Sequence, residues 1–416
     1  MNELHLLAMS YVFFLALIGG EILISFARKD GGYRVTEAVV NIGHGVVYQV
    51  WDSFTKVLVM VPFLWVAANI PWRTLPFDAP WAWLVGLLAY DCVSYWAHRH
   101  HHEINLLWAI HGNHHAAEDF NLAAGLRQAM LQHAFRWLWK LPLALLMPVE
   151  MYIGLVVFDY LYQFLQHTRY VPKLGPIGWV FNTPSHHRVH HGRQEKYLDR
   201  NYGGILIIWD RLFGTFQAEE EAPDYGLTRP LNTLNAVWAN FAIYAQLVAA
   251  TGRASGLDKA RVWLGSPAEL HRLAPGGPSS SPAAVNTAVN TAVNVTNDAL
   301  PLRLRLYIIG SGLLVPPLLG WLLVAGAGWS LGARVGLAAL ILLSVVCAGG
   351  LLERKRWAVW LEALRWLAGA AGFSIAAGTA LPMLMAPLGL FGLFGLGAAA
   401  QVRITPAPAA SAAPRQ

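Results

Sequence analysis

Histidines are the residues of this sequence whose type and spacing most directly suggest chemistry. Thirteen of the sixteen histidines lie in one stretch, residues 98–191. An HxxxH pair begins at His98, and the pattern HxxHH follows twice, beginning at His111 and at His187. Residues three or four apart lie on one face of a helix, so each pattern can present several imidazoles to one point. With the solitary His167, the candidate metal ligands are His98, His102, His111, His114, His115, His167, His187, His190 and His191.

Nine convergent imidazoles are more ligands than one metal ion needs. Imidazole binds iron, copper, zinc and nickel, but a structural zinc takes four ligands and a catalytic zinc three. A haem iron takes one or two axial ligands from the protein. Nine suffice for two metal ions with four or five nitrogens each and an open position for O2. The HExxH pattern of zinc proteases does not occur in the sequence. We therefore predict a two-metal site.

Carboxylates near these patterns are candidates for orienting or catalytic roles, because a ligating imidazole needs an acceptor for its second ring N–H. Asp91 lies two turns before His98 in an apolar segment, where an unpaired carboxylate is costly. Asp159 precedes His167 in the same way, and Glu103 follows the first pattern directly. We predict functional roles for these three acids. Other polar neighbours can support the ligands or lie at the surface: Glu118, Asn121, His100, His101 and His186. Four further histidines are expected to be structural: His5, His44, His133 and His271.

The composition indicates a membrane protein. Apolar residues make up 56% of the chain and charged residues only 13%, against about 25% charged in an ordinary soluble domain. Part of the surface must therefore face lipid. The net charge of +6 is spread out, without a basic run interleaved with aromatics, which argues against nucleic-acid binding. The two cysteines, Cys92 and Cys347, exclude a disulfide framework, a CxxC zinc site and thiolate-held iron–sulfur clusters.

Apolar stretches long enough to cross a bilayer predict an all-α, multi-pass transmembrane bundle. The first stretch ends at Arg28 and Lys29, which the positive-inside rule places in the cytoplasm. Alternating the spans from there puts the histidine-rich di-metal site at the cytoplasmic face. The predicted spans lie near residues 6–27, 48–70, 79–96, 137–148 with an upstream extension, 151–166, 305–326, 331–350, 361–383 and 386–402.

Composition also predicts how the chain divides into domains. Residues 1–250 carry the histidine patterns and are predicted to form the membrane-embedded catalytic domain. Residues 251–300 include a Pro/Gly/Ser-rich stretch and the repeat AVNTAVNTAVNV, whose low apolar bulk predicts a flexible linker. Residues 301–402 are predicted to form a second transmembrane bundle without recognisable chemistry. Residues 403–416 are predicted to form a disordered tail.

Two stretches resemble the fatty acid hydroxylase / sterol desaturase superfamily. They read DCVSYWAHRHHHEINLLWAIHGNHHAAEDFNLAAGLRQ, from Asp91, and NTPSHHRVHHGRQEKYLDRNYGGILIIWDRLFGTF, from Asn182. The resemblance covers about residues 10–220, and several motifs recur in order. Within the superfamily, HEIN, AEDFN, YQFLQHT and TPSHHRVHHGR are similar to the pattern of the alkylglycerol monooxygenase branch.

The resemblance implies a membrane oxygenase in which the nine histidines hold two iron ions and O2 is used to hydroxylate or desaturate a lipid. The alkylglycerol branch implies hydroxylation of the carbon next to a glyceryl ether oxygen, with tetrahydrobiopterin as the reductant. Glu103 matches a carboxylate that this branch needs, which makes it a candidate for binding the pterin. The sequence has no GxGxxG fingerprint, P-loop or fused haem module, so the electron donor must arrive separately.

Two positions depart from the superfamily's patterns. Fatty acid hydroxylases carry His where this chain has Gln163, which favours the alkylglycerol-like branch, and Ala116 stands where Ser is usual. A sterol, carotenoid or fatty acyl substrate stays open. A different class, a protein that binds or passes zinc or copper, also stays open, although a transporter would place ligands near the bilayer midplane. A zinc hydrolase of lipids would use fewer ligands and a carboxylate base.

Overall fold

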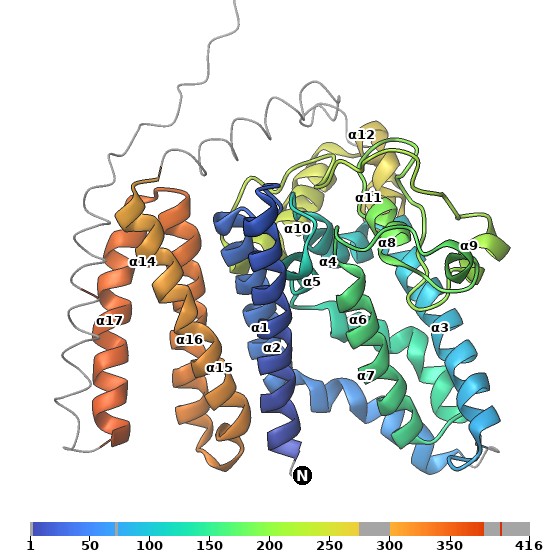
Figure 1. Ribbon diagram of the computed structural model, residues 1–416, viewed down its shortest axis with the longest axis horizontal. Helices are drawn as coiled ribbons and strands as arrows, with labels where there is room; N and C mark the ends of the chain where they lie inside the picture. The colour runs from blue at the N-terminus through green and yellow to red at the C-terminus, as the bar shows by residue number, and fades with distance from the viewer. Residues whose placement is uncertain (1–2, 71–73, 274–299, 378–391, 393–416) are drawn as a thin grey trace, which may run out of the picture. The chain divides into compact units, whose positions relative to one another are not determined.

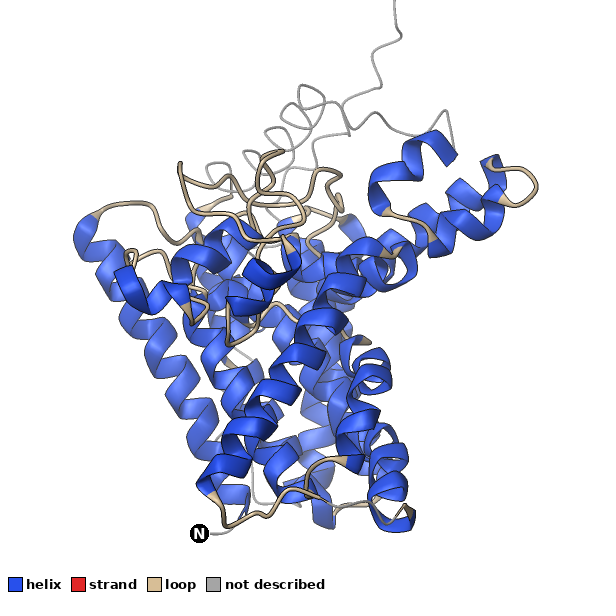
Figure 2. Cartoon of the chain, turned by 90° about the vertical axis from the view of Figure 1, so that its right-hand side faces the viewer, coloured by secondary structure: helices blue, strands red, loops and turns tan. Residues whose placement is uncertain are grey.

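A computed structural model of the chain describes residues 3–70, 74–273, 300–377 and 392. Over these residues the regular secondary structure is helical, with two isolated β-bridges and no strand (Figure 2). The prediction of an all-α fold is therefore confirmed for the described part of the chain. The chain divides into two compact units, residues 1–294 and residues 295–416.

Four long helices frame the first unit (Figure 1). They are α1 (Glu3–Arg28), α2 (Val35–Asn69), α3 (Pro80–Glu103) and α7 (Val149–Gln166). Proline stands at the first position of α3 and just before α7, where a missing backbone N–H costs nothing. Phe63, Tyr90, Met147 and Met151 belong to one buried apolar cluster that joins α2, α3 and α7. This cluster fixes the helices that carry the histidines at their ends.

Most of the remaining helices lie toward one end of the first unit (Figure 2). They are α4 (Asn105–His115), α5 (Leu122–Gly125), η2 (Gly175–Trp179), α8 (Pro184–His190), α9 (Ile208–Phe213), α10 (Ala236–Arg253), α11 (Asp258–Leu264), η3 (Pro267–Glu269) and α12 (Leu270–Leu273). Helices α6 (Gln132–Lys140) and η1 (Leu141–Leu145) instead lead to the start of α7, where the carbonyl of Leu146 accepts from Leu75 N over 2.7 Å. Ala109 of α4 packs in one buried cluster with Ile243 and Leu247 of α10. Val262 and Leu270 extend that cluster into α11 and α12. The cluster therefore packs α10, α11 and α12 against α4, which carries several of the histidines.

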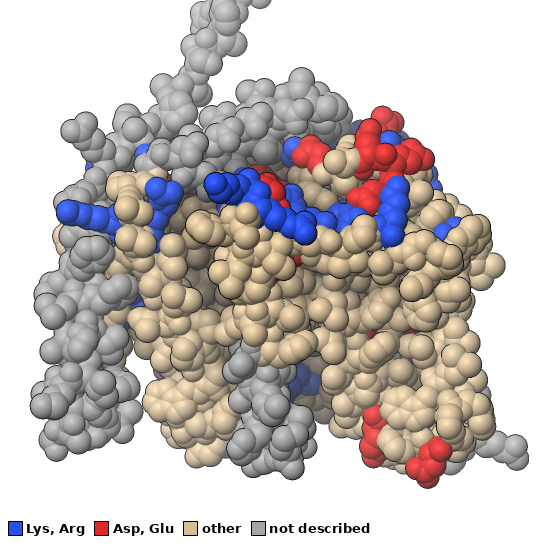
Figure 3. All heavy atoms as spheres, in the orientation of Figure 1, with Lys and Arg blue, Asp and Glu red and all other residues tan. Residues whose placement is uncertain are grey.

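Three helices in the described residues are long and apolar enough to cross a membrane. They are α2, the segment Leu302–Val324 and Leu331–Leu352. On α2, Leu58 is 70% exposed and Trp65 60% exposed, as expected for side chains that face lipid. In the first unit, Figure 3 shows Lys, Arg, Asp and Glu concentrated around the end with the short helices, and mostly uncharged surface along the long helices.

The structure qualifies three predicted spans. The segment predicted near 137–148 is not one continuous α-helix, because α6 has nine residues and passes into the short 3-10 helix η1. Helices α3 and α7 cover the spans predicted near 79–96 and 151–166, but neither is among the three apolar helices. Polar residues such as Asp91 and Asp159 interrupt their apolar faces. The total number of spans stays a prediction.

The predicted linker and tail are described only in part. Residues 274–299 and 403–416 lie outside the described residues, as does the span predicted near 386–402. Within the segment expected to be flexible, residues 258–273 instead form α11, η3 and α12. Their apolar side chains pack on α10, which supplies the buried area that the Pro/Gly/Ser-rich part lacks. The domain boundaries themselves stay a prediction.

The second unit is a helical bundle with a buried ion pair. Its helices are α14 (Leu302–Leu313), α15 (Val315–Val324), η4 (Gly326–Gly328), α16 (Leu331–Leu352) and α17 (Arg356–Ala377). On α17, Arg365 Nε donates to Glu362 Oε2 over 2.8 Å, and both side chains are buried. Arg365 also donates to Ser311 of α14 and Ser344 of α16. The pair thus joins three helices of the bundle.

This ion pair predicts an asymmetric response to substitution. Arg365→Leu leaves the Glu362 carboxylate buried without its cation, and we expect the free energy of unfolding to fall by about 3–5 kcal/mol. The double variant Glu362→Leu/Arg365→Leu removes both charges and should be more stable than the single variant. Thermal unfolding in detergent measures both. A double variant less stable than Arg365→Leu would contradict this account.

Candidate metal centre

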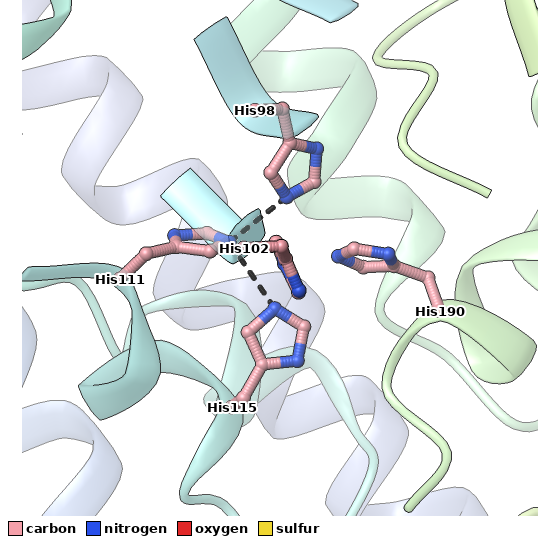
Figure 4. A group of neighbouring side chains, drawn as sticks. All are labelled: His98, His102, His111, His115 and His190. Carbon is pink, nitrogen blue, oxygen red and sulfur yellow. Dashed lines mark hydrogen bonds between the residues drawn. The ribbon is translucent and has the colours of Figure 1, made fainter. Parts of the chain in front are cut away.

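Five histidines form the first group of candidate ligands. His98 and His102 come from α3, His111 and His115 from α4, and His190 from α8. One ring nitrogen of each lies within 4.8 Å of the others. Figure 4 shows the five rings pointing toward one another from three helices. All five side chains are buried.

The other four predicted ligands form a second group. His114 comes from α4, His167 follows α7, His187 lies in α8, and His191 follows α8. Their ligand atoms also lie within 4.8 Å of one another, and all four are buried. The two groups are neighbours, because the rings of His115 and His191 stack with centroids 4.3 Å apart. The structure therefore brings all nine predicted ligands together and divides them five and four.

The spacing between ring nitrogens fits shared metal ions. In the first group, His111 Nε2 lies 2.8 Å from His98 Nε2 and 3.1 Å from His115 Nε2. In the second, His187 Nε2 lies 3.0 Å from His167 Nε2. Two imidazole nitrogens bound at right angles to one metal ion, each at about 2.1 Å, are about 3.0 Å apart. The observed separations match that value.

Backbone carbonyls fix the tautomers of several ligands. A carbonyl oxygen only accepts, so His114 Nδ1 must donate to Arg127 O and His167 Nδ1 to Gln163 O, each over 2.8 Å. Their Nε2 atoms then carry lone pairs, and these atoms face each other at 3.3 Å. Two acceptors cannot form a hydrogen bond. A bound cation between them satisfies both, so the donor set fits a metal ion.

The first group is held in the same way. His98 Nδ1 donates to Tyr202 O over 2.8 Å, and His190 Nδ1 donates to Arg200 O over 2.9 Å. Within the described residues, His190 Nε2 and His102 Nε2 are buried without a hydrogen-bond partner. Buried polar atoms normally have partners. These inward-facing nitrogens are therefore further positions that a metal ion would satisfy.

Burial keeps the imidazoles neutral. Desolvation and the neighbouring rings hold the pKa of His111 and of His115 well below the ordinary value of 6.5. The same causes lower the pKa of His187 and of His191. Burial lowers the pKa of His167 to about 4. Near neutral pH each ring therefore offers the lone pair that metal binding needs.

Local structure explains why three neighbouring histidines are not in either group. His186 closes the N-terminal capping box of α8, where Thr183 N donates to its Nδ1 over 3.3 Å. His100 Nδ1 accepts from Trp139 Nε1 over 2.8 Å, and His101 Nδ1 donates to the carbonyl of Ala97. These histidines support the helices that carry the ligands.

Asp91 lies away from the histidine nitrogens and holds a loop. Its carboxylate accepts from the backbone N–H groups of Ile205 and Leu206, each over 2.9 Å, and from Trp209 Nε1 over 3.0 Å. The same loop carries Tyr202, whose carbonyl orients His98. Asp91 therefore acts on the site through the loop, as a positioning residue.

Asp159 sits beside Asp91 and connects to the second group. Its carboxylate accepts from Tyr90 OH over 3.0 Å and from Gln163 Nε2 over 2.6 Å. Gln163 in turn offers its carbonyl to His167, so its side chain points to Asp159 and its backbone orients a ligand. A Cβ on Gly204 would lie 3.1 Å from Asp91 Oδ1 and 3.2 Å from Asp159 Oδ1. Glycine thus lets the loop approach both carboxylates.

Glu103 lies outside both histidine groups. Its carboxylate accepts from Arg99 Nε over 2.8 Å, and its side chain is 43% exposed. The acid near the first group is Asp199, whose Oδ1 lies 3.6 Å from His102 Nδ1. Asp199 could not be singled out from the sequence, because no periodic pattern links it to the histidines.

Two further acids that the sequence analysis missed fix the loops around the site. Asp210 accepts from the N–H groups of Tyr202 and Gly203, each over 2.7 Å. Glu21 of α1 accepts from Leu122 N over 2.7 Å and is buried. Of the weaker candidates, Asn121 caps α5 by accepting from Ala124 N over 3.2 Å. Glu118 lies 3.5 Å from the guanidinium of Arg34.

Residues 83–215 match the family model of fatty acid hydroxylases. The zebrafish alkylglycerol monooxygenase is 33% identical over 356 residues, which cover 85% of this chain and 79% of that protein. The human alkylglycerol monooxygenase is 41% identical over 230 residues, 55% of this chain and 52% of that protein. The ornithine lipid hydroxylase OlsE of Rhizobium tropici is 33% identical over 151 residues, 35% of this chain and 45% of that protein. No solved structure matches the chain.

The apolar helices and the two all-histidine groups define a helical membrane protein with two neighbouring groups of buried histidines. The family match and the relatives identify it further: the chain belongs to the fatty acid hydroxylase family, and it is similar to alkylglycerol monooxygenases within that family. The chain spans only about half the length of the human and frog relatives that it matches.

The lowered histidine pKa values predict how pH affects the metal-free protein. The unfolded chain binds protons on histidine below about pH 6.5, whereas folded His167 does so only near pH 4. The unfolded state therefore binds more protons in this window, and stability must fall as the pH falls from about 6.5 toward 4. Denaturant unfolding at pH 7.5 and pH 5 measures the loss. His167→Asn should show a smaller dependence, and a flat profile for the unchanged protein would contradict the prediction.

Proposed function

We propose that this protein is a membrane-bound non-haem di-iron oxygenase that uses O2 to hydroxylate a lipid C–H bond. The observation that carries the proposal is the division of nine buried histidines into groups of five and four, with ring nitrogens directed inward. Single-metal sites need fewer ligands. Membership of the fatty acid hydroxylase family supports the lipid chemistry.

In this proposal each group holds one iron ion. His98, His102, His111, His115 and His190 would bind one ion, and His114, His167, His187 and His191 the other. Iron supplies the activation of O2. In His98, His114, His167 and His190 the Nδ1 proton is held on a backbone carbonyl, so that the Nε2 of each of these four rings stays available to a metal ion. The buried surroundings exclude water from the reaction.

For the substrate we propose an ether lipid, an alkylglycerol, hydroxylated at the carbon next to the ether oxygen. The relatives named alkylglycerol monooxygenase support this assignment over others. The reductant would be an external tetrahydrobiopterin. Glu103, which is part-exposed beside Arg99, is our candidate to contact it. Asp91 and Asp159 would position the ligands.

We also propose that the site faces the cytoplasm. The end of α1 carries Arg28 and Lys29, and the side of the first unit with the short helices carries most of its charge. A second candidate activity is hydroxylation or desaturation of a sterol. A sterol 5(6)-desaturase of Aspergillus fumigatus, 27% identical over 135 residues, supports it less strongly than the ether-lipid relatives do.

Metal analysis of the purified protein tests the site. We expect about two iron atoms per chain. His115→Ala and His191→Ala each remove one ligand, from the first and the second group respectively, and should lose about one iron atom. His100→Gln is a matched control, because it lies between two ligands and keeps the acceptor for Trp139. Zinc in place of iron, or full iron content in both ligand variants, would overturn the assignment.

Turnover tests the reaction. Protein purified without oxygen should consume O2 and convert an alkylglycerol only when reduced pterin is added, because the sequence provides no electron-transfer module of its own. The measurement is product formation with and without the pterin, with a sterol and a fatty acyl lipid as comparison substrates. Product from the sterol and none from the ether lipid would move the assignment to the second candidate.

A further inference from the structure

A pocket of about 170 Å³ opens onto the first histidine group. Its floor includes His102, His115 and His190, three of the five candidate ligands of that group. Figure 4 shows the rings of these three facing the centre of the group. A molecule in the pocket would therefore lie next to the proposed metal ion.

One wall of the pocket is apolar. Trp108 of α4 and Ile243 and Leu247 of α10 line it, and they belong to the buried cluster that joins these helices or pack against it. Trp108 also stands beside the ligands, with its ring centroid 5.1 Å from that of His102. The wall is therefore fixed by the core and by the metal site together. An apolar wall of this kind favours contact with the carbon atoms of a small ligand over contact with water.

Two arginines, Arg193 and Arg229, line the pocket. Arg193 Nε donates to Asp224 Oδ2 over 2.7 Å, and its side chain is 13% exposed. Its Nη1 is buried without a hydrogen-bond partner among the described residues. Arg229 is half-buried and has no ion-pair partner in the described part of the chain. A buried guanidinium with free donors favours an anionic oxygen group.

A second positive charge lies near Arg229. Arg253 acts on Arg229 as a like charge from the end of α10, and it does not line the pocket. The acid that lines the pocket, Asp199, is 58% exposed and points toward His102. Of the two pocket arginines, only Arg193 therefore has a carboxylate partner. Arg229 is therefore available to pair with a negative charge on a ligand.

We propose that this pocket binds the phosphate of the substrate lipid's headgroup between Arg193 and Arg229. The inference rests on the proposed function and deepens it: the preferred substrate is an ether lipid that carries a phosphate, and a neutral alkylglycerol is a poorer one. The pocket touches both the arginines and the histidines, so one glycerol phosphate headgroup can contact the arginines while its ether carbon lies at the first group. The volume suits such a headgroup and excludes a long alkyl chain, which must extend elsewhere.

Substrate discrimination tests this proposal. The iron-loaded protein is assayed with a 1-O-alkylglycerol 3-phosphate and with the matching neutral 1-O-alkylglycerol. We expect the first to have the higher kcat/KM. Arg229→Gln should lower the ratio of the two kcat/KM values about tenfold, because a charge-assisted contact is lost. The matched control Arg261→Gln removes an exposed arginine that pairs with Asp258 and does not line the pocket, and it should keep the ratio. A ratio near one in the unchanged protein, or a ratio that Arg229→Gln leaves unaltered, overturns the proposal.

A binding measurement separates this proposal from the proposed function. Thermal unfolding is followed with the alkylglycerol phosphate, with the neutral lipid and with inorganic phosphate. We expect the phosphate-bearing lipid to raise the Tm more than the neutral lipid does, and Arg229→Gln to abolish the difference. That result without any O2-dependent turnover supports the pocket and rejects the oxygenase. In another outcome, inorganic phosphate raises the Tm and the phosphate-bearing lipid does not displace it from the pocket. That outcome would assign the pocket to a soluble anion and overturn the proposal that it binds a lipid headgroup.

Discussion

The structure of the first unit depends on the hydrogen bond from a histidine Nδ1 to a backbone carbonyl. His98, His114, His167 and His190 each make this bond, and it directs the opposite nitrogen into the centre. The inward-facing lone pairs repel one another, which makes the metal-free fold less stable. A bound cation would remove this repulsion. Buried polar atoms without partners are costly for the same reason. This cost supports our proposal that each group holds a metal ion.

The carbonyls themselves must be held in place, and carboxylates do this from a distance. Asp91 and Asp210 grip the loop that contains Tyr202, and Asp159 holds the side chain of Gln163. Their role is mechanical support of the carbonyls that orient the imidazoles. Burying a carboxylate is unfavourable, yet these acids lie buried beside a site made only of histidines. They hold in place the backbone carbonyls that orient the imidazoles.

Eight of the nine candidate ligands could be picked out from their spacing, because positions three and four apart share a helix face whatever the tertiary fold, whereas His167 stands alone. Their division into two groups could not. His114 and His115 are adjacent, and which group each joins depends on how α8 approaches α4. Asp91 was predicted to matter, but only the structure shows that it acts through a loop. Arg193 and Arg229 belong to no periodic pattern, and apolar composition alone could not show that the segment near 137–148 changes from α-helix to 3-10 helix.

One consequence follows from the helices that the two groups share. His114 and His115 are consecutive residues that serve different groups, and so are His190 and His191. Consecutive residues cannot move independently, because one stretch of backbone carries both. A metal ion bound in one group would therefore also restrain the backbone of the other group. Substitutions that displace these backbone stretches should disturb both groups, whereas substitution of a single ligating side chain should affect only its own group.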